Sequence, residues 1–152
     1  MLRENGFHWS EEGFLRSESF ASVRVWRDSD VLLKLDFVND SAPLFGEVNK
    51  TDLFYRTDSI HNILSNKLSA IFRFAGKDIA DIREIALREE IDWHTVIQEA
   101  RQKEAGIELI YISEILAGMP QSEFEMIAWV KKPDWDEFRN DIGRIVFDML
   151  AR

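Results

Sequence analysis

Asp36 stands among bulky apolar residues in the stretch 31–38. Apolar side chains recur at every second position of this stretch, which is typical of a β-strand. The alternation places Asp36 on the face opposite Leu35 and Phe37. A carboxylate in such surroundings raises the free energy of the folded state unless a metal ion, a lysine or a substrate pairs with it. Asp36 is therefore the first candidate for a functional site.

Lys67 interrupts the apolar stripe of a predicted helix. It follows Ile63 by four residues and precedes Ile71 by four, so the three side chains share one helix face. Two interpretations stay open. The lysine can bury its aliphatic stem and keep its ammonium in water, or it can point into a cleft to meet a phosphate or a carboxylate.

Two acids follow in the segment 77–82. Asp78 and Asp81 are three residues apart and therefore share one side of a helix. Asp78 lies near the predicted helix start, where a negative charge meets the positive end of the helix dipole, so capping is enough to explain it. Asp81 lies near the apolar face, and pairing with Lys67 or Arg73 of the preceding helix would satisfy its charge.

These residues must be positioned by a strand-rich part at 1–56 and a helical part at 57–152. Alternation predicts strands at about 20–27 and 31–38, paired as an antiparallel hairpin, and a shorter strand at 44–48. Apolar spacing, N-cap residues and glycine or proline stops predict helices at about 58–75, 78–88, 93–104, 109–117, 122–130 and 134–151. We therefore expect a single α+β domain over 1–152, with a small antiparallel or mixed sheet before a helical half.

Composition narrows the classes of function. The chain has 152 residues, of which 45% are hydrophobic and 31% charged, as in ordinary globular proteins. The absence of cysteine excludes disulfides, thiolate metal sites and thiol catalysis. No apolar run reaches the length of a membrane span, and the first residues lack the apolar stretch of a secretory signal. We expect a cytoplasmic protein, and its net charge of −9 disfavours broad, non-specific binding to nucleic acid.

Several familiar site motifs are missing from the sequence. His8, His61 and His94 are far apart and form no ligand set. The seven glycines are scattered and form no phosphate-binding loop, and no nucleophile motif of the Ser/His/Asp type occurs. The acids and lysines above are the remaining candidates for chemistry.

Three separated motifs resemble those of a known family. The strand LKLDFVND is followed by S-x-x-N-I-L-S-N-K-L-S-A-I-F-R and then by K-D-I-A-D-I. In this order they resemble the AbiEii/AbiGii toxin family of nucleotidyltransferase-like proteins. The resemblance covers residues 30–85 closely, and the segment 91–150 is similar to one branch of the family. It implies a small mixed sheet with flanking helices, followed by a helical half, and a toxin–antitoxin setting.

The resemblance also implies roles for single residues. Asp36 matches the third carboxylate of the family and would be a metal ligand and a catalytic residue. Lys67 and Asp81 match the lysine and the acid of the later motifs and would be the other catalytic residues. Nucleotide contacts would come from charged residues of the two helical motifs, namely Lys67, Arg73, Lys77 and Asp78. An active member would use Mg²⁺ and a nucleoside triphosphate.

One part of the family pattern is missing. The sequence contains no Gly-Gly helix entry. It also contains no Asp-x-Asp strand, since Asp28 and Asp30 have the right spacing but lie in a predicted turn. Nucleotidyl transfer needs two divalent ions held by a carboxylate cluster, and magnesium binds weakly to a lone carboxylate such as Asp36. We therefore expect a truncated member of the family that is not catalytic on its own.

Three functions stay open. In the first, the chain is a binding or interaction module whose sheet has an uncovered edge, which a homodimer or a complementing protein chain would cover. In the second, it is an active metal-dependent nucleotidyltransferase that uses Asp36, Asp40 and a carboxylate from elsewhere, or that a partner chain completes. In the third, it is a helical adaptor in which Lys67 and Asp81 form a structural ion pair.

Overall fold

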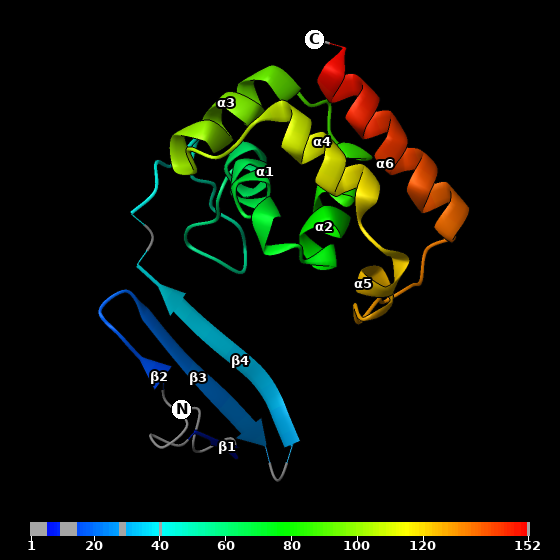
Figure 1. Cartoon of the computed structure of the whole chain (residues 1–152). Coiled ribbons are helices and arrows are strands. Elements are labelled where there is room, and N and C mark those ends of the chain that lie inside the picture. The colour runs from blue at the N-terminus through cyan, green and yellow to red at the C-terminus, as the bar shows by residue number, and fades with distance from the viewer. Residues whose placement is uncertain (1–5, 10–14, 28–29, 40, 152) are drawn as a thin grey trace. The chain divides into compact units, whose positions relative to one another are not determined.

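The computed structural model describes residues 6–9, 15–27, 30–39 and 41–151, with the backbone alone for 30–32. Within these residues it has a four-stranded antiparallel sheet in the N-terminal part and α-helices after it (Figure 1). The predicted α+β class is confirmed. The chain divides into two compact units, Met1–Ala42 and Pro43–Arg152. The single domain over 1–152 stays a prediction.

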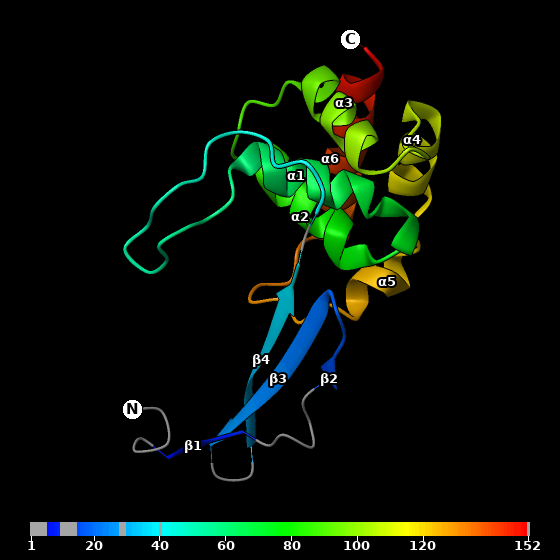
Figure 2. The same cartoon turned by 90° about the vertical axis from the view of Figure 1, so that its left-hand side faces the viewer.

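The first unit is built around a long antiparallel hairpin, as predicted (Figure 2). Strand β3 (Phe20–Arg27) pairs along one edge with β4 (Asp30–Val38). Two short strands, β1 (Phe7–His8) and β2 (Leu15–Arg16), share the other edge of β3. The central position of β3 therefore leaves β4 at an edge of the described sheet.

Cross-strand pairing gives the hairpin one apolar and one polar face. Val23 lies opposite Leu35, and Ser22 lies opposite Asp36. Paired residues point to the same side and successive residues to opposite sides. The central aliphatic pairs therefore lie on one face and the central polar pairs on the other, which also carries the Phe20–Val38 pair. Val23 is buried, whereas Leu35 is exposed.

The second unit is helical, and most of its boundaries agree with the predicted ones. Its helices are α1 (Ile60–Ser69), α2 (Gly76–Ala86), α3 (Trp93–Lys103), α4 (Leu109–Gly118), α5 (Gln121–Glu125) and α6 (Trp135–Leu150). The predicted start of α1 is confirmed, because the Ser59 side chain accepts a hydrogen bond from the Asn62 N–H. Asp134 caps α6 in the same way, accepting from two backbone N–H groups.

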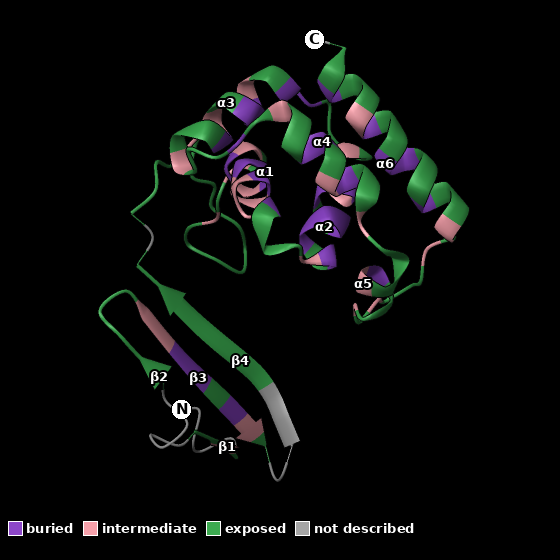
Figure 3. Ribbon diagram, viewed as in Figure 1, coloured by how far each residue is buried: buried purple, intermediate pink, exposed green. Residues whose placement is uncertain are grey.

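One apolar cluster forms the core of the helical unit. Its most deeply buried members lie on α1, α2, α3, α4 and α6 and include Leu64, Leu68, Ile79, Ile82, Val96, Ile112 and Phe138. Burying one such side chain contributes about 1.5–3 kcal/mol. Figure 3 shows buried positions along these helices. The apolar stripes read from the sequence therefore face one another and hold α1 against α2 and α2 against α6.

Two predicted elements differ in the structure. No strand forms over 44–48, where side chains of the α1 region satisfy the loop backbone instead. The Phe45 N–H donates to Asn62 Oδ1, and the Ser59 hydroxyl donates to the Phe45 carbonyl. The predicted helix over 122–130 stops at Glu125, and the Trp129 ring N–H then donates to the Phe124 carbonyl.

The segment between α1 and α2 also departs from a continuous helix ending at Gly76. Helix α1 ends at Ser69, a short 3₁₀ turn (Ile71–Arg73) follows, and Phe74 adopts the left-handed region with φ 52°. Gly76 begins α2, and a Cβ there would lie 2.7 Å from the Glu123 carbonyl oxygen, so this close approach requires glycine. Asp28 and Asp40, two acids considered in the sequence analysis, lie outside the described residues.

Candidate functional site

Helices α1 and α2 bring three of the predicted site residues together. Lys67 lies in the last turn of α1, and Asp78 and Asp81 lie on α2. The Lys67 Nζ is 3.0 Å from Asp78 Oδ1 and 2.6 Å from Asp81 Oδ2. The ammonium is therefore held between two carboxylates, and we call these three residues the lysine cluster.

The two acids of the lysine cluster are buried to very different degrees. The Asp78 side chain is 3% exposed, and that of Asp81 is 52% exposed. The sequence predicts helix capping for Asp78 and the need for a partner for Asp81, and the structure differs because Asp78 is the buried acid. Asp78 Oδ2 accepts no hydrogen bond from the described residues, and Arg73 Nη2 lies 3.7 Å from it. Lys67 and Arg73 together stabilise this buried charge.

The charge of Lys67 is fixed by its neighbours. Burial lowers the pKa of the ammonium, but hydrogen bonds and electrostatic attraction from Asp81 and Asp78 outweigh it, so the pKa of Lys67 is raised above its ordinary 10.5. Lys67 is positively charged at neutral pH and its charge is matched within the cluster. This lysine does not expose a free ammonium to water.

Two clefts flank α2 near the lysine cluster. The first has a volume of about 450 Å³ and is lined by apolar residues of α1 and α2 and by the charged residues Lys67, Asp81, Glu84, Arg88 and Glu89. The second has a volume of about 720 Å³ and is lined by the segment 127–134 together with charged residues of α2 and its neighbours, namely Lys77, Asp81, Arg83, Glu84, Arg88 and Glu137. Asp81 lines both clefts. Lys67 lines only the first and Lys77 only the second, so these two predicted nucleotide contacts face different spaces.

Asp36 belongs to the first unit of the chain, not to the helical unit that holds the lysine cluster. Its carboxylate accepts hydrogen bonds from the Ser22 hydroxyl at 2.5 Å and from the Lys34 ammonium at 2.7 Å. Lys34 lies two residues away on the same strand face. The sequence predicts a metal ion, a lysine or a substrate as the partner of Asp36, and in the structure a lysine is beside it.

Within the described residues, the surroundings of Asp36 do not fit a paired-magnesium site. An ammonium beside the carboxylate repels a divalent cation, and magnesium prefers several oxygen ligands. Across the described residues, no three or more His, Cys, Asp or Glu side chains are grouped so that they could hold a metal ion. No step of a reaction is therefore assigned to a metal at Asp36.

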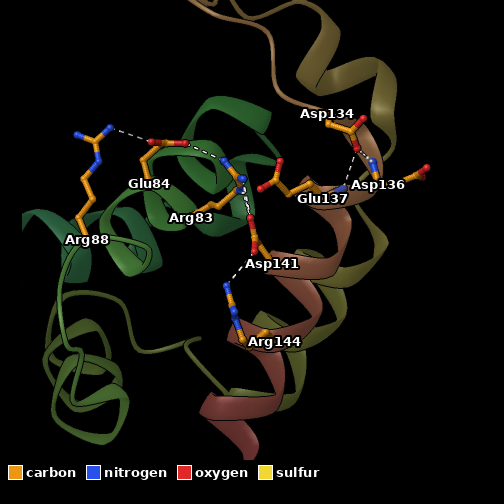
Figure 4. Close-up of polar contacts among 8 residues, drawn as sticks. All are labelled: Arg83, Glu84, Arg88, Asp134, Asp136, Glu137, Asp141 and Arg144. Carbon is orange, nitrogen blue, oxygen red and sulfur yellow. Dashed lines mark hydrogen bonds and ion pairs between the residues drawn. The ribbon is translucent and has the colours of Figure 1, made fainter.

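A second charged cluster, missed in the sequence, joins α2 to α6 (Figure 4). Arg83 Nε and Nη2 donate to Asp141 Oδ2 at 2.9 and 2.5 Å, and Arg83 Nη1 donates to Glu84 at 2.8 Å. The Arg83 guanidinium also lies 4.9 Å from the centre of the Phe138 ring. The Arg83 and Asp141 side chains are only 8% and 12% exposed. We call Arg83 and Asp141 the arginine cluster.

Part of this second cluster had a signal in the sequence. Asp141 sits between Phe138 and Ile142 on the apolar face of the last helix, which is where an acid needs a partner. Its partner is 58 residues away, and no local spacing relates the two. Spacing arguments reach only neighbouring turns and helices, so they cannot identify Arg83.

Comparison with known proteins gives no match: neither a family model, nor a curated protein, nor a solved structure matches this chain. The resemblance to the AbiEii/AbiGii family therefore stays a prediction. A search of the described residues finds no helix with the length and apolar character needed to span a membrane.

Proposed function

We propose that this chain is a nucleotidyltransferase-like protein of the AbiEii/AbiGii type that acts as a binding or interaction module and does not transfer nucleotides on its own. A cytoplasmic location is part of this proposal. The observation that carries it is the lysine cluster, in which one ammonium is held by two carboxylates, at 3.0 and 2.6 Å.

The family assignment is supported by the way the motif residues converge. Lys67 belongs to one quoted motif and Asp78 and Asp81 to the next, and the helices that carry them lie side by side. Lys67 and Asp81 line the cleft of about 450 Å³ between α1 and α2, and the buried Asp78 contacts Lys67. Residues that only filled a helix surface would have no reason to meet at one cleft.

The absence of transfer chemistry is supported by charge. Catalysis of phosphoryl transfer depends on positive groups aimed at the charge of the triphosphate. At the lysine cluster, the positive charges of Lys67 and of the neighbouring Arg73 are balanced by the negative charges of Asp78 and Asp81. In the first unit Asp36 is neutralised by Lys34. Neither place offers the excess of positive charge, or the set of free carboxylates, that the reaction needs.

Titration calorimetry tests this proposal. The chain is titrated with each nucleoside triphosphate to millimolar concentration, with and without Mg²⁺. We expect no saturable heat that depends on Mg²⁺. A saturable signal that requires Mg²⁺ and is lost in Asp36→Asn, but kept in the control Asp52→Asn on an exposed loop, would contradict the proposal and favour an active transferase.

A helical adaptor is the second candidate, and the deep burial of Asp78 favours it. If the lysine cluster serves only to hold α1 against α2, an apolar pair of similar volume can replace it. Lys67→Met together with Asp78→Leu then leaves the free energy of unfolding unchanged or raised. A large loss of stability in this double variant, measured by urea denaturation, would count against the adaptor.

A further inference from the structure

The pairing of β4 with β3 determines which residues of β4 direct their backbone N–H and C=O groups toward the outer edge of the sheet. The Asn39 N–H donates to the Ser19 carbonyl, so this pair is a hydrogen-bonded one in the β3–β4 ladder. Hydrogen-bonded and non-bonded pairs alternate in an antiparallel ladder. The backbone groups of Leu33, Leu35 and Phe37 therefore point toward β3. Those of Lys34, Asp36 and Val38 point outward, where no other described strand pairs.

The residues of β4 are self-complementary about Leu35. If a second β4 lies antiparallel beside the first with Leu35 opposite Leu35, Lys34 of each copy faces Asp36 of the other. Lys34 and Asp36 already contact each other within one chain. Both are outward-pointing positions, so in this register they also form the hydrogen-bonded pairs between the two copies. Leu33 of each copy then faces Phe37 of the other on the apolar side.

Neighbouring registers lack this match. Because hydrogen bonds between the two copies require outward-pointing residues to lie opposite each other, only some registers are possible. In each of them the two-fold axis passes through a residue and not between two residues. An axis at Lys34 or at Asp36 places like charges directly opposite, which is unfavourable. The register centred on Leu35 is the one that pairs both charges, and it pairs them twice because the arrangement is symmetric.

Exposure of the apolar side adds a second argument. Leu33, Leu35 and Phe37 are all exposed large apolar residues on one face of β4. In the register centred on Leu35 they line up across the two strands and cover part of one another's surface, which is favourable. A long edge strand with exposed apolar residues is otherwise a site of uncontrolled association.

We propose that β4 pairs with β4 of a second copy of this chain, antiparallel and with the two-fold axis at Leu35, to form one continuous sheet. The proposal names the partner of the interaction module but rests on the first unit alone. If nucleotide titration contradicts the proposed function, this dimer stands, and if the dimer fails, the titration result is unaffected.

Cysteine cross-linking tests the register, because the chain contains no cysteine of its own. Opposed residues of a non-hydrogen-bonded pair are close enough for a disulfide. Leu35→Cys should form a disulfide-linked dimer at low micromolar protein under mild oxidation. Leu33→Cys alone should not, but Leu33→Cys mixed with Phe37→Cys should. Leu53→Cys, at an exposed loop position, is the control for random collision.

Charge reversal tests the pairing of Lys34 with Asp36 by sedimentation equilibrium. Lys34→Asp or Asp36→Lys should each raise the dimer dissociation constant by about tenfold or more, because two attractive pairs become repulsive. An equimolar mixture of the two variants should dimerise as tightly as the parent chain, since each reversed residue then meets an opposite charge. Far-ultraviolet circular dichroism establishes that each variant is folded.

Three results would overturn the proposal. A folded parent chain that stays monomeric up to about 100 µM, the concentration range of ordinary weak dimers, excludes it. So does cross-linking of Leu35→Cys that is no faster than that of Leu53→Cys. A dimer that forms equally well with either single charge reversal, and is not restored by mixing, places the interface elsewhere.

Discussion

Helix α2 carries two charged clusters that differ in exposure. Toward α1 it contributes Asp78 and Asp81 to the lysine cluster, and toward α6 it contributes Arg83 to the arginine cluster. In the arginine cluster both partners are almost fully buried. In the lysine cluster one acid is buried and the other is half exposed beside a cleft.

This difference separates a structural role from a role in binding. Arg83 and Asp141 are almost fully buried and hold α2 against α6, although Arg83 also lines the second cleft. The lysine cluster keeps Asp81 in contact with water and with two clefts. We expect changes in the arginine cluster to lower the free energy of unfolding strongly, and changes at Asp81 to alter it very little.

The largest effect is expected for Arg83→Met. The substitution keeps much of the packing on Phe138 but leaves the buried Asp141 with Arg144 as its remaining partner. We expect the free energy of unfolding to fall by about 3 kcal/mol. Urea denaturation measures this, with Arg139→Met in the exposed pair with Asp136 as a control that changes stability by less than about 0.5 kcal/mol. Equal effects at Arg83 and Arg139 would remove the distinction.

The next effect is expected for Lys67→Met. It leaves the buried Asp78 with Arg73 at 3.7 Å and no hydrogen bond from the lysine. A loss of about 2 kcal/mol is expected, because an uncompensated buried carboxylate is costly. Thermal and urea unfolding of the variant, compared with Lys67→Arg, provide the check. A loss below about 0.5 kcal/mol would mean that Asp78 does not depend on Lys67.

The same cluster predicts a loss of stability at alkaline pH. Because the pKa of Lys67 is higher in the folded chain than its ordinary 10.5, the stabilisation is fully present below 10.5. It is lost as pH rises through the raised pKa, since the unfolded chain releases the proton first. The free energy of unfolding, measured as pH is raised through this range, should fall more steeply for the parent chain than for Lys67→Met. Parallel slopes in the two proteins would show that Lys67 does not contribute.

The smallest effect is expected for Asp81→Asn. Its side chain is half exposed, so its ion pair with Lys67 is screened by water and contributes less than about 1 kcal/mol. Asp78→Asn, on the buried side of the same lysine, is the matched comparison and should destabilise the chain more. If the two variants lose the same stability, the difference in exposure between the two acids has no energetic meaning.

Local patterns predicted much of this fold. Alternation identified the β3–β4 hairpin, and apolar spacing after two possible N-cap residues, Asp58 and Ser59, identified α1, whose N-cap is Ser59. The pairing of Lys67 with Asp81 could be predicted because their helices are consecutive. A strand over 44–48 was predicted wrongly, because the hydrogen bonds that Asn62 and Ser59 make to Phe45 are tertiary.

The remaining features of the site depend on packing. The burial of Asp78 follows from how α1, the 3₁₀ turn and α2 meet, which spacing does not report. The pairing of Arg83 with Asp141 spans 58 residues, and its partners become neighbours only when α2 packs on α6. The type of a secondary-structure element and its apolar spacing are set by residues close in sequence. The partner of a buried charge is set by tertiary packing.

Nucleotidyl transfer itself is the most direct test of the central claim that the chain does no such chemistry alone. The purified chain is incubated with Mg²⁺ and the four labelled nucleoside triphosphates, and the release of pyrophosphate is measured. We expect no release of pyrophosphate above that of a sample without protein. Release that requires the chain and disappears in both Lys67→Met and Asp36→Asn would contradict it.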